Sequence, residues 1–168
     1  MFIPYNKIED DSRCWIYQVD KKITSLEKKF IEKKIRYFCE NWTSHNVPVK
    51  SSFIIDLDYY ILLFADEQHT NISGCAIDEQ RKIIEKISEE LKIKISTYNR
   101  IGVFINNKLI FLSKKEIIDR INKYEMSSNS EIINITIKNK KEYQKKWIRT
   151  IKESWMKNIL TKKIPLSE

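Results

Sequence analysis

Hydrophobic positions follow a strand period in some blocks of the chain and a helix period in others, which defines the predicted elements. Arg13 to Val19 is predicted as a strand. Thr24-Ser25-Leu26-Glu27 has the capping-box form that starts a helix, which we expect to continue to Trp42. Two strands follow, Ser52 to Leu57 and Tyr59 to Ala65. The second is a continuous apolar run, typical of a buried strand and too short to span a membrane.

The middle of the chain predicts a helix and a hairpin. Apolar residues from Ile77 to Leu91 mark one face of a helix, for which Ser73 is the expected N-cap. Ile101 to Ile105 and Leu109 to Leu112 predict two strands that turn at Asn106-Asn107, because Asn tolerates positive φ.

Three further elements complete the pattern. Ser113-Lys114-Lys115-Glu116 is a second capping box and begins a helix. Ile133 to Ile137 alternates with polar residues, as a half-exposed strand does. A last helix, about Lys141 to Leu160, has apolar residues at i+4 steps. These residues are Tyr143, Trp147, Ile151 and Trp155.

The order β-α-β-β-α-β-β-α-β-α predicts an α+β fold in a single domain spanning residues 1–168. We expect one mainly antiparallel sheet with helices packed on one face. The first six elements match a ferredoxin-like core, the split βαβ arrangement, and an extra hairpin and the C-terminal helix would follow it.

Composition limits the class of protein. A chain of 168 residues with 42% hydrophobic content can bury a core without disulfides or metal. Cys14, Cys39 and Cys75 are widely spaced, so neither a disulfide framework nor a paired zinc motif is indicated. No signal peptide is recognisable, and we expect a soluble cytoplasmic protein with no membrane partner.

The formal net charge of +8 is concentrated at the C-terminal end. Residues Lys138 to Lys163 have ten basic and two acidic side chains, whereas the rest of the chain is balanced. Lysine outnumbers arginine 25 to 6 and isoleucine reaches 30, which is typical of codon drift in an AT-rich genome. The total charge is therefore weak evidence for nucleic-acid binding, and its position is more informative.

The loop from Asp66 to Asp78 is the candidate functional site. If Ser73 is the N-cap, Cys75 lies in the first turn, where outward N–H groups and the helix dipole favour a thiolate. His69 could fold back as its general base, and Asp66 or Asp78 could orient that histidine. Ser73 and Gly74 could instead place backbone N–H groups around an anion. A small buried Cys that only fills space is the alternative interpretation of Cys75.

Other chemistry finds less support. His45, His69 and Cys75 are scattered, so a zinc site is not indicated, and we expect no cofactor. Gly74 and Gly102 are the only glycines, which excludes the P-loop of nucleotide hydrolases.

The basic C-terminal helix is an alternative site, for RNA or the ribosome. Lys145, Lys146, Arg149 and Lys152 could neutralise phosphates, and Trp147 could stack on a base. The i+4 stripe of apolar residues is more often typical of a helix that packs its apolar face on a core.

Several segments together resemble an uncharacterised bacterial family of similar length that is often labelled "ABC transporter ATPase". These segments are Phe2-Ile3-Pro4, Arg13-Cys14-Trp15-Ile16-Tyr17-Gln18, Asn41-Trp42-Thr43-Ser44-His45, Ser73-Gly74-Cys75-Ala76-Ile77-Asp78 and Ser154-Trp155. The label implies ATP hydrolysis, for which this chain has no Walker lysine. The family usually has Ser where this chain has Ala76, so a hydroxyl there is missing.

Three functions remain open from the sequence. The first is thiol-dependent hydrolysis or transfer at Cys75, on a small-molecule or protein substrate that the sequence does not identify. The second is an RNA- or ribosome-associated binding module, and the third is a non-catalytic protein-interaction module.

Overall fold

The computed structural model describes residues 1–68, 70–96 and 100–158. The chain forms two compact units where the sequence predicts a single domain. The first unit comprises Met1–Thr97 and Lys138–Tyr143, and the second comprises Tyr98–Ile137 and Gln144–Glu168. The chain crosses between the units three times, and the second crossing, from Ile137 to Lys138, coincides with the start of the basic C-terminal region.

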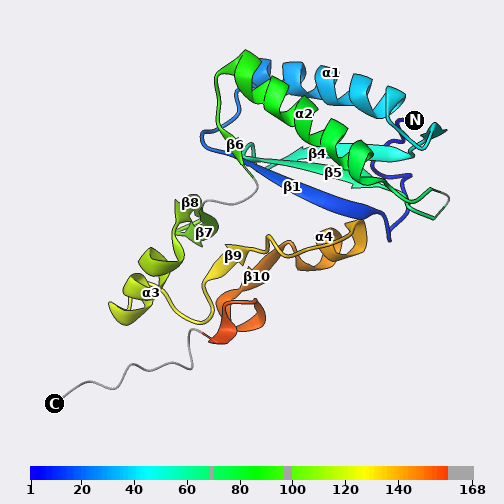
Figure 1. Cartoon of the computed structure of the whole chain (residues 1–168). Coiled ribbons are helices and arrows are strands. Elements are labelled where there is room, and N and C mark those ends of the chain that lie inside the picture. The colour runs from blue at the N-terminus through cyan, green and yellow to red at the C-terminus, as the bar shows by residue number, and fades with distance from the viewer. Residues whose placement is uncertain (69, 97–99, 159–168) are drawn as a thin grey trace. The chain divides into compact units, whose positions relative to one another are not determined.

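The first unit is built on a four-stranded antiparallel sheet with the order β4-β5-β1-β6. Its strands are β1 (Arg13–Val19), β4 (Ser51–Asp56), β5 (Tyr60–Ala65) and β6 (Ile95–Ser96). Helices α1 (Ser25–Asn41) and α2 (Gly74–Leu91) lie on one face of this sheet (Figure 1). Each helix joins two strands that are separated by a third, which is the split βαβ connectivity. The prediction of an α+β fold is confirmed.

The helix-covered face contains the main core of the first unit. Both central strands supply residues to it, because alternate side chains of a strand point to the same face. The helices contribute residues at i+4 and i+3 spacing, as their sequence pattern predicts. This cluster includes Tyr17, Val19, Ile61, Leu63, Ile31, Ile35, Cys39, Ile84 and Ile87.

The opposite face of the sheet is covered in part by the segment Lys138–Tyr143. The N–H of Cys14 donates to the carbonyl oxygen of Lys138 at 2.8 Å, which joins this segment to β1. The ring of Tyr143 packs against that of Phe64 at 6.0 Å, and its hydroxyl donates to Asp56 Oδ2 at 3.0 Å. Lys140 is buried, and its ammonium group forms an ion pair with the carboxylate of Asp10 at 3.2 Å. A residue from the basic C-terminal region is thus part of the first unit's packing.

A small hairpin follows α1. Its strands are β2 (Thr43–Ser44) and β3 (Val47–Pro48), and its turn residues His45 and Asn46 have φ values of 52° and 63°. Positive φ at both central residues is the requirement of a type I′ turn. The segment from Thr43 to Pro48 is therefore a tight β-hairpin.

The second unit has its own antiparallel sheet, with the order β10-β9-β7-β8. Its strands are β7 (Ile101–Ile105), β8 (Lys108–Leu112), β9 (Glu131–Ile133) and β10 (Ile148–Thr150). Asn106 and Asn107 adopt φ values of 49° and 59°, which confirms the predicted hairpin turn. Helix α3 (Lys114–Asn122) begins with the predicted capping box of Ser113 and Glu116.

Two predictions in this unit are wrong. The last helix does not run from Lys141 to Leu160: α4 (Lys140–Lys146) stops, and β10 and the 3₁₀ turn η1 (Ile151–Glu153) replace it. Ile148–Thr150 pairs with Glu131–Ile133, so tertiary pairing overrides the helical spacing. Leu160 lies outside the described residues.

The strand predicted from Ile133 to Ile137 is not formed over that range. The observed strand, β9, ends at Ile133. The side-chain oxygen of Asn134 accepts two hydrogen bonds from Thr136, one from its backbone N–H at 3.2 Å and one from its hydroxyl at 2.7 Å. Such an Asx turn competes with strand pairing, and the structured strand is Glu131–Ile133.

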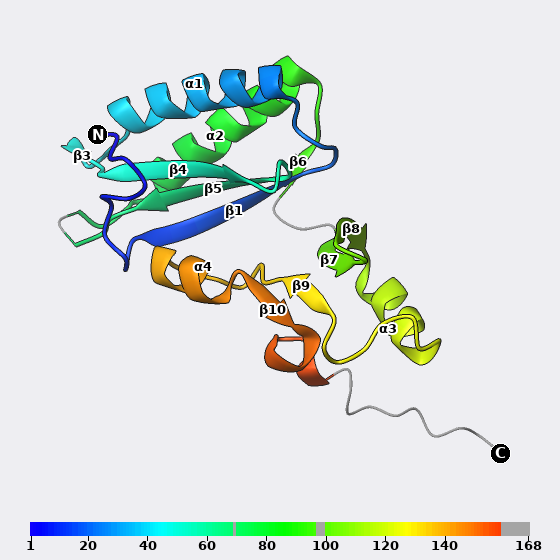
Figure 2. The same ribbon diagram turned by 180° about the vertical axis from the view of Figure 1, so that it is seen from behind.

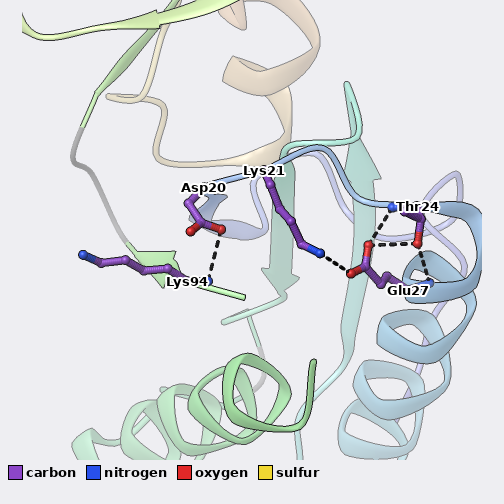
Figure 3. Close-up of polar contacts among 5 residues, drawn as sticks. All are labelled: Asp20, Lys21, Thr24, Glu27 and Lys94. Atoms are coloured by element: carbon purple, nitrogen blue, oxygen red, sulfur yellow. Dashed lines mark hydrogen bonds and ion pairs between the residues drawn. The ribbon is translucent and has the colours of Figure 1, made fainter. Parts of the chain in front are cut away.

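The start of α1 is held by the capping box that the sequence predicts (Figure 3). The N–H of Glu27 donates to Thr24 Oγ1 at 3.3 Å, and the N–H of Thr24 donates to Glu27 Oε2 at 2.8 Å. Lys21 Nζ donates to Glu27 Oε1 at 2.7 Å. The hydrogen bond from Lys21, followed by those from Thr24, lowers the pKa of Glu27 to about 2. On the other side of Lys21, the N–H of Lys94 donates to Asp20 Oδ1 at 3.1 Å (Figure 3).

Replacing Thr24 by Ala is expected to lower the free energy of unfolding by about 1 kcal/mol, because the change leaves a helix N–H without its acceptor. Urea denaturation followed by circular dichroism measures this change. Ser25→Ala, one residue along, is the matched control and is expected to have little effect. Equal losses in the two variants would show that the capping box does not stabilise α1.

The contribution of Glu27 should depend on pH. The pKa of Glu27 in the folded protein, about 2, lies below its ordinary value of 4.5. Its carboxylate therefore stabilises the fold fully at pH values above 4.5. This stabilisation is lost as the pH falls from 4.5 through 2. The stability difference between the parent protein and Glu27→Gln should therefore shrink over that range. A constant difference would contradict this role.

Candidate functional site

Helix α2 begins where the sequence predicts, with Ser73 as its N-cap. Ser73 Oγ accepts the N–H of Ala76 at 3.2 Å, which fixes the first turn. The N–H groups of Gly74 and Cys75 have no hydrogen-bond partner within residues 1–68, 70–96 and 100–158. A Cβ at Gly74 would meet nothing within 4 Å, so this end of the helix is open. The first turn therefore has exposed donors beside the thiol of Cys75.

The hairpin after α1 holds this helix start in place. The indole N–H of Trp42 donates to the carbonyl oxygen of Ala76 at 3.0 Å in a buried position. Ser44 Oγ donates to the carbonyl oxygen of Asn71 at 2.8 Å and accepts the N–H of Ser73 at 3.0 Å. These three bonds join two segments about thirty residues apart in sequence. Sequence reasoning did not find Trp42 and Ser44 as positioning residues, although both lie in the segment Asn41–His45 that supports the family resemblance.

Aromatic packing fixes the indole that makes the first of these bonds. The ring of Phe38 lies 5.0 Å from that of Trp42, and the ring of Trp15 lies 6.1 Å away, edge to face. Trp42 is 1% exposed. A buried indole N–H needs an acceptor, so the position of the Ala76 carbonyl is strongly constrained.

Cys75 differs from the other two cysteines in its surroundings. Cys14 and Cys39 are buried, whereas Cys75 is exposed. Burial raises the pKa of Cys39 to about 11 and that of Cys14 further, so neither forms a thiolate near neutral pH. The alternative in which Cys75 fills space in the core is wrong, since its side chain faces solvent.

The proposed partners of Cys75 are placed differently from one another. Asp78 is exposed and lies one turn further along α2, where it pairs with Arg81 at 3.5 Å. Asp66 is 4% exposed, and its Oδ1 accepts the N–H of Gln68 at 2.9 Å. No hydrogen bond links Cys75 with either carboxylate in the described part of the chain. His69 lies outside the described residues, so its role as a base stays a prediction.

Asp66 also borders a small cavity of about 100 Å³. The cavity is lined by Ile3, Lys7, Ile8, Glu9, Lys50 and Asp66. Cys75 is not among these residues. Asp66 thus borders this cavity, and its carboxylate also accepts the N–H of Gln68 at the end of β5.

Metal binding finds no support in the described ranges. They contain no group of three or more His, Cys, Asp or Glu side chains placed to hold an ion. His45 is at the exposed turn of the β2–β3 hairpin.

The residues proposed to bind nucleic acid do not share one helix. Lys145 and Lys146 end α4, Arg149 is in β10 and Lys152 is in η1. Trp147 is only 7% exposed, so its predicted stacking on a base is wrong. Trp155, at 39% exposed, is the accessible indole of this region. Lys145, Lys146 and Lys152 remain exposed.

Comparisons with protein-family models, with curated proteins and with solved structures find no match. The resemblance to the bacterial family therefore stays a prediction. No helix in the described residues is long and apolar enough to cross a membrane.

Ser44→Ala should loosen the start of α2, because it removes one donor and one acceptor that hold the preceding loop. We expect the unfolding free energy to fall by about 1–3 kcal/mol, in the range for the removal of a buried hydrogen-bonding group. The amide of Ser73 should exchange with solvent at least about tenfold faster.

Thr43→Ala is the matched control, because Thr43 is exposed in the same hairpin. Unchanged exchange at Ser73 in Ser44→Ala would mean that the hairpin does not hold the loop.

Proposed function

We propose that this protein is a thiol-dependent enzyme, a hydrolase or transferase, with Cys75 as its nucleophile. The observation that carries the proposal is the exposure of Cys75 in the first turn of α2, an 18-residue helix, while the other two thiols are buried. No acidic residue lies in that first turn to oppose the positive end of the helix dipole. An exposed thiol in this position is open to a substrate, and cysteine attacks as its thiolate.

The arrangement supports an acyl-transfer step. The sulfur of Cys75 attacks the acyl carbon of a substrate, and His69 takes the thiol proton and returns it to the leaving group. Water then hydrolyses the thioester, or an acceptor nucleophile takes the acyl group. The N–H groups of Gly74 and Cys75 are the donors available for the developing oxyanion.

The orienting carboxylate would be Asp78 or Asp66. Asp78 is exposed beside the helix start and makes only a weak ion pair with Arg81, so its carboxylate is available to orient a histidine. Asp66 has one carboxylate oxygen engaged by the N–H of Gln68, which leaves its other oxygen for the imidazole.

The location of such an enzyme follows from its chemistry. We propose a cytoplasmic protein, since reducing conditions keep exposed cysteines as free thiols.

Iodoacetamide should label only Cys75 in the native protein at pH 7, and faster than it labels free cysteine. His69→Ala should slow this reaction at least about tenfold, because the thiol loses its base. His45→Ala, which changes an exposed histidine in the nearby hairpin, is the control and should leave the rate unchanged. Mass spectrometry of the labelled peptides measures all three cysteines.

A rate no greater than that of free cysteine would remove the enzymatic proposal. Equal slowing by His69→Ala and His45→Ala would remove the assignment of His69 as the base.

A second candidate is RNA or ribosome binding through the basic residues of the second unit. The exposure of Lys145, Lys146 and Lys152, together with the accessible indole of Trp155, favours it. Replacing all three lysines by Ala should lower the salt dependence of single-stranded RNA binding by about 0.7 for each phosphate that is no longer neutralised. An unchanged slope would dismiss this candidate.

A further inference from the structure

β4 is an edge strand of the first unit's sheet, and its outer side is only partly paired. The N–H of Ser51 donates to the carbonyl oxygen of Met1 at 3.0 Å, and the N–H of Ile3 donates to the carbonyl oxygen of Ser51 at 2.8 Å. The N-terminal segment thus forms a parallel bridge at this residue. It continues as Pro4, which has no N–H to donate.

Within the part of the chain that the structure describes, the outer side of β4 has no backbone partner at Phe53 and Ile55, which follow Ser51 by two and four residues. Backbone groups of alternate residues point to the same side of a strand, so Phe53 and Ile55 face outward as Ser51 does. Their N–H and C=O groups have no outer partner among the described residues. Edge strands with unpaired groups are templates for the addition of another strand.

A groove of about 500 Å³ lies beside these residues. One wall is the ridge of Lys28, Glu32 and Arg36, which are four residues apart on α1. The other wall contains Pro4 and Tyr5, and residues 53–55 line the groove between the walls. In Figure 2 the N-terminal segment, α1 and β4 lie side by side, so the groove belongs to a single unit.

The two sides of the groove differ in chemistry. Phe53 and Ile55 share the helix face of the sheet, so an added strand would meet the cations of α1 on that face. Ile54 points to the opposite face, where Tyr5 packs against Phe64 at 5.3 Å. An added strand would therefore meet charged side chains on one face and apolar ones on the other.

The charge of the helix wall is positive on balance. Arg36 stacks over the ring of Phe2 at 4.1 Å and makes no ion pair with the described residues. Lys28 and Lys22 share a single carboxylate, that of Asp58, at 3.8 and 3.6 Å. Glu32 is the acidic residue at the groove. A carboxylate on a ligand would find an unpaired guanidinium here.

We propose that this groove binds an extended acidic peptide segment of another protein, which adds a strand to the edge of β4. The peptide backbone pairs with Phe53 and Ile55, its acidic side chains face Lys28 and Arg36, and its apolar side chains cover Ile54 and Tyr5. Backbone pairing gives affinity and alternate side chains give specificity, as in other cases of strand addition. A second copy that paired through the same edge fits less well, because it would bring the positively charged helix walls of the two copies together.

The probe is a fluorescein-labelled eight-residue peptide in which Val and Asp alternate, with a matched peptide of alternating Val and Lys. Fluorescence anisotropy with the full chain should show binding of the Val–Asp peptide at least about tenfold tighter than the Val–Lys peptide, or about 1.4 kcal/mol. Hydrogen exchange at the amides of Phe53 and Ile55 should slow when the Val–Asp peptide binds.

Two variants locate the binding. Arg36→Glu should weaken binding at least about tenfold, whereas Lys33→Glu, an exposed position on α1 that does not line the groove, should change it less than about twofold. Ile55→Pro removes an outward N–H but no hydrogen bond to β5, and should also weaken binding at least about tenfold.

The proposal is overturned if both peptides bind equally, if neither binds, or if protection appears away from β4. Light scattering that shows a dimer, abolished by Ile55→Pro, would assign the edge to a second copy and would also overturn it. Cys75→Ser should bind the Val–Asp peptide normally, so failure of the thiol chemistry and failure of this proposal are distinguishable.

Discussion

The hydrogen bond from the Trp42 indole to the Ala76 carbonyl is the interaction on which the proposed site depends. It is buried, and three aromatic rings meet around it, so the indole has little freedom to find another acceptor. It fixes the first turn of α2 against the end of α1. Ser44 fixes the loop before that turn from the same hairpin. The result is an exposed thiol on a rigid support, which is the arrangement that a reactive group needs.

Burial divides the three cysteines of the first unit by role. Cys39 is on the buried face of α1, and Cys14 is in β1. Desolvation raises the pKa of both thiols. Cys75 is left as the accessible sulfur. The open edge of β4 is a separate feature, built from α1 and the N-terminal segment rather than from α2. The same unit thus has a candidate chemical site on one helix and a candidate binding site beside the other.

Local sequence signals predicted most of the elements correctly. Thr24 with Glu27, Ser113 with Glu116 and Ser73 each specify a helix start through contacts within three residues, so the sequence alone was sufficient. Asn106-Asn107 likewise specified a turn. The last predicted helix failed because Ile148–Thr150 pairs with β9, a contact with no local signal. The burial of Trp147 agrees with the alternative in which the apolar stripe packs on a core, and disagrees with stacking on a base.

The candidate site was only partly predictable. The N-cap at Ser73 and the place of Cys75 in the first turn follow from local spacing, but the exposure of Cys75 depends on how the segments pack. The bonds from Trp42 and Ser44 cross about thirty residues, and no periodicity indicates them. The most direct test of the account is the iodoacetamide rate of Cys75 in Trp42→Phe, which keeps an aromatic ring and removes the indole N–H. We expect the rate to fall toward that of free cysteine while circular dichroism shows that the fold is retained. An unchanged rate would mean that the indole bond does not position Cys75.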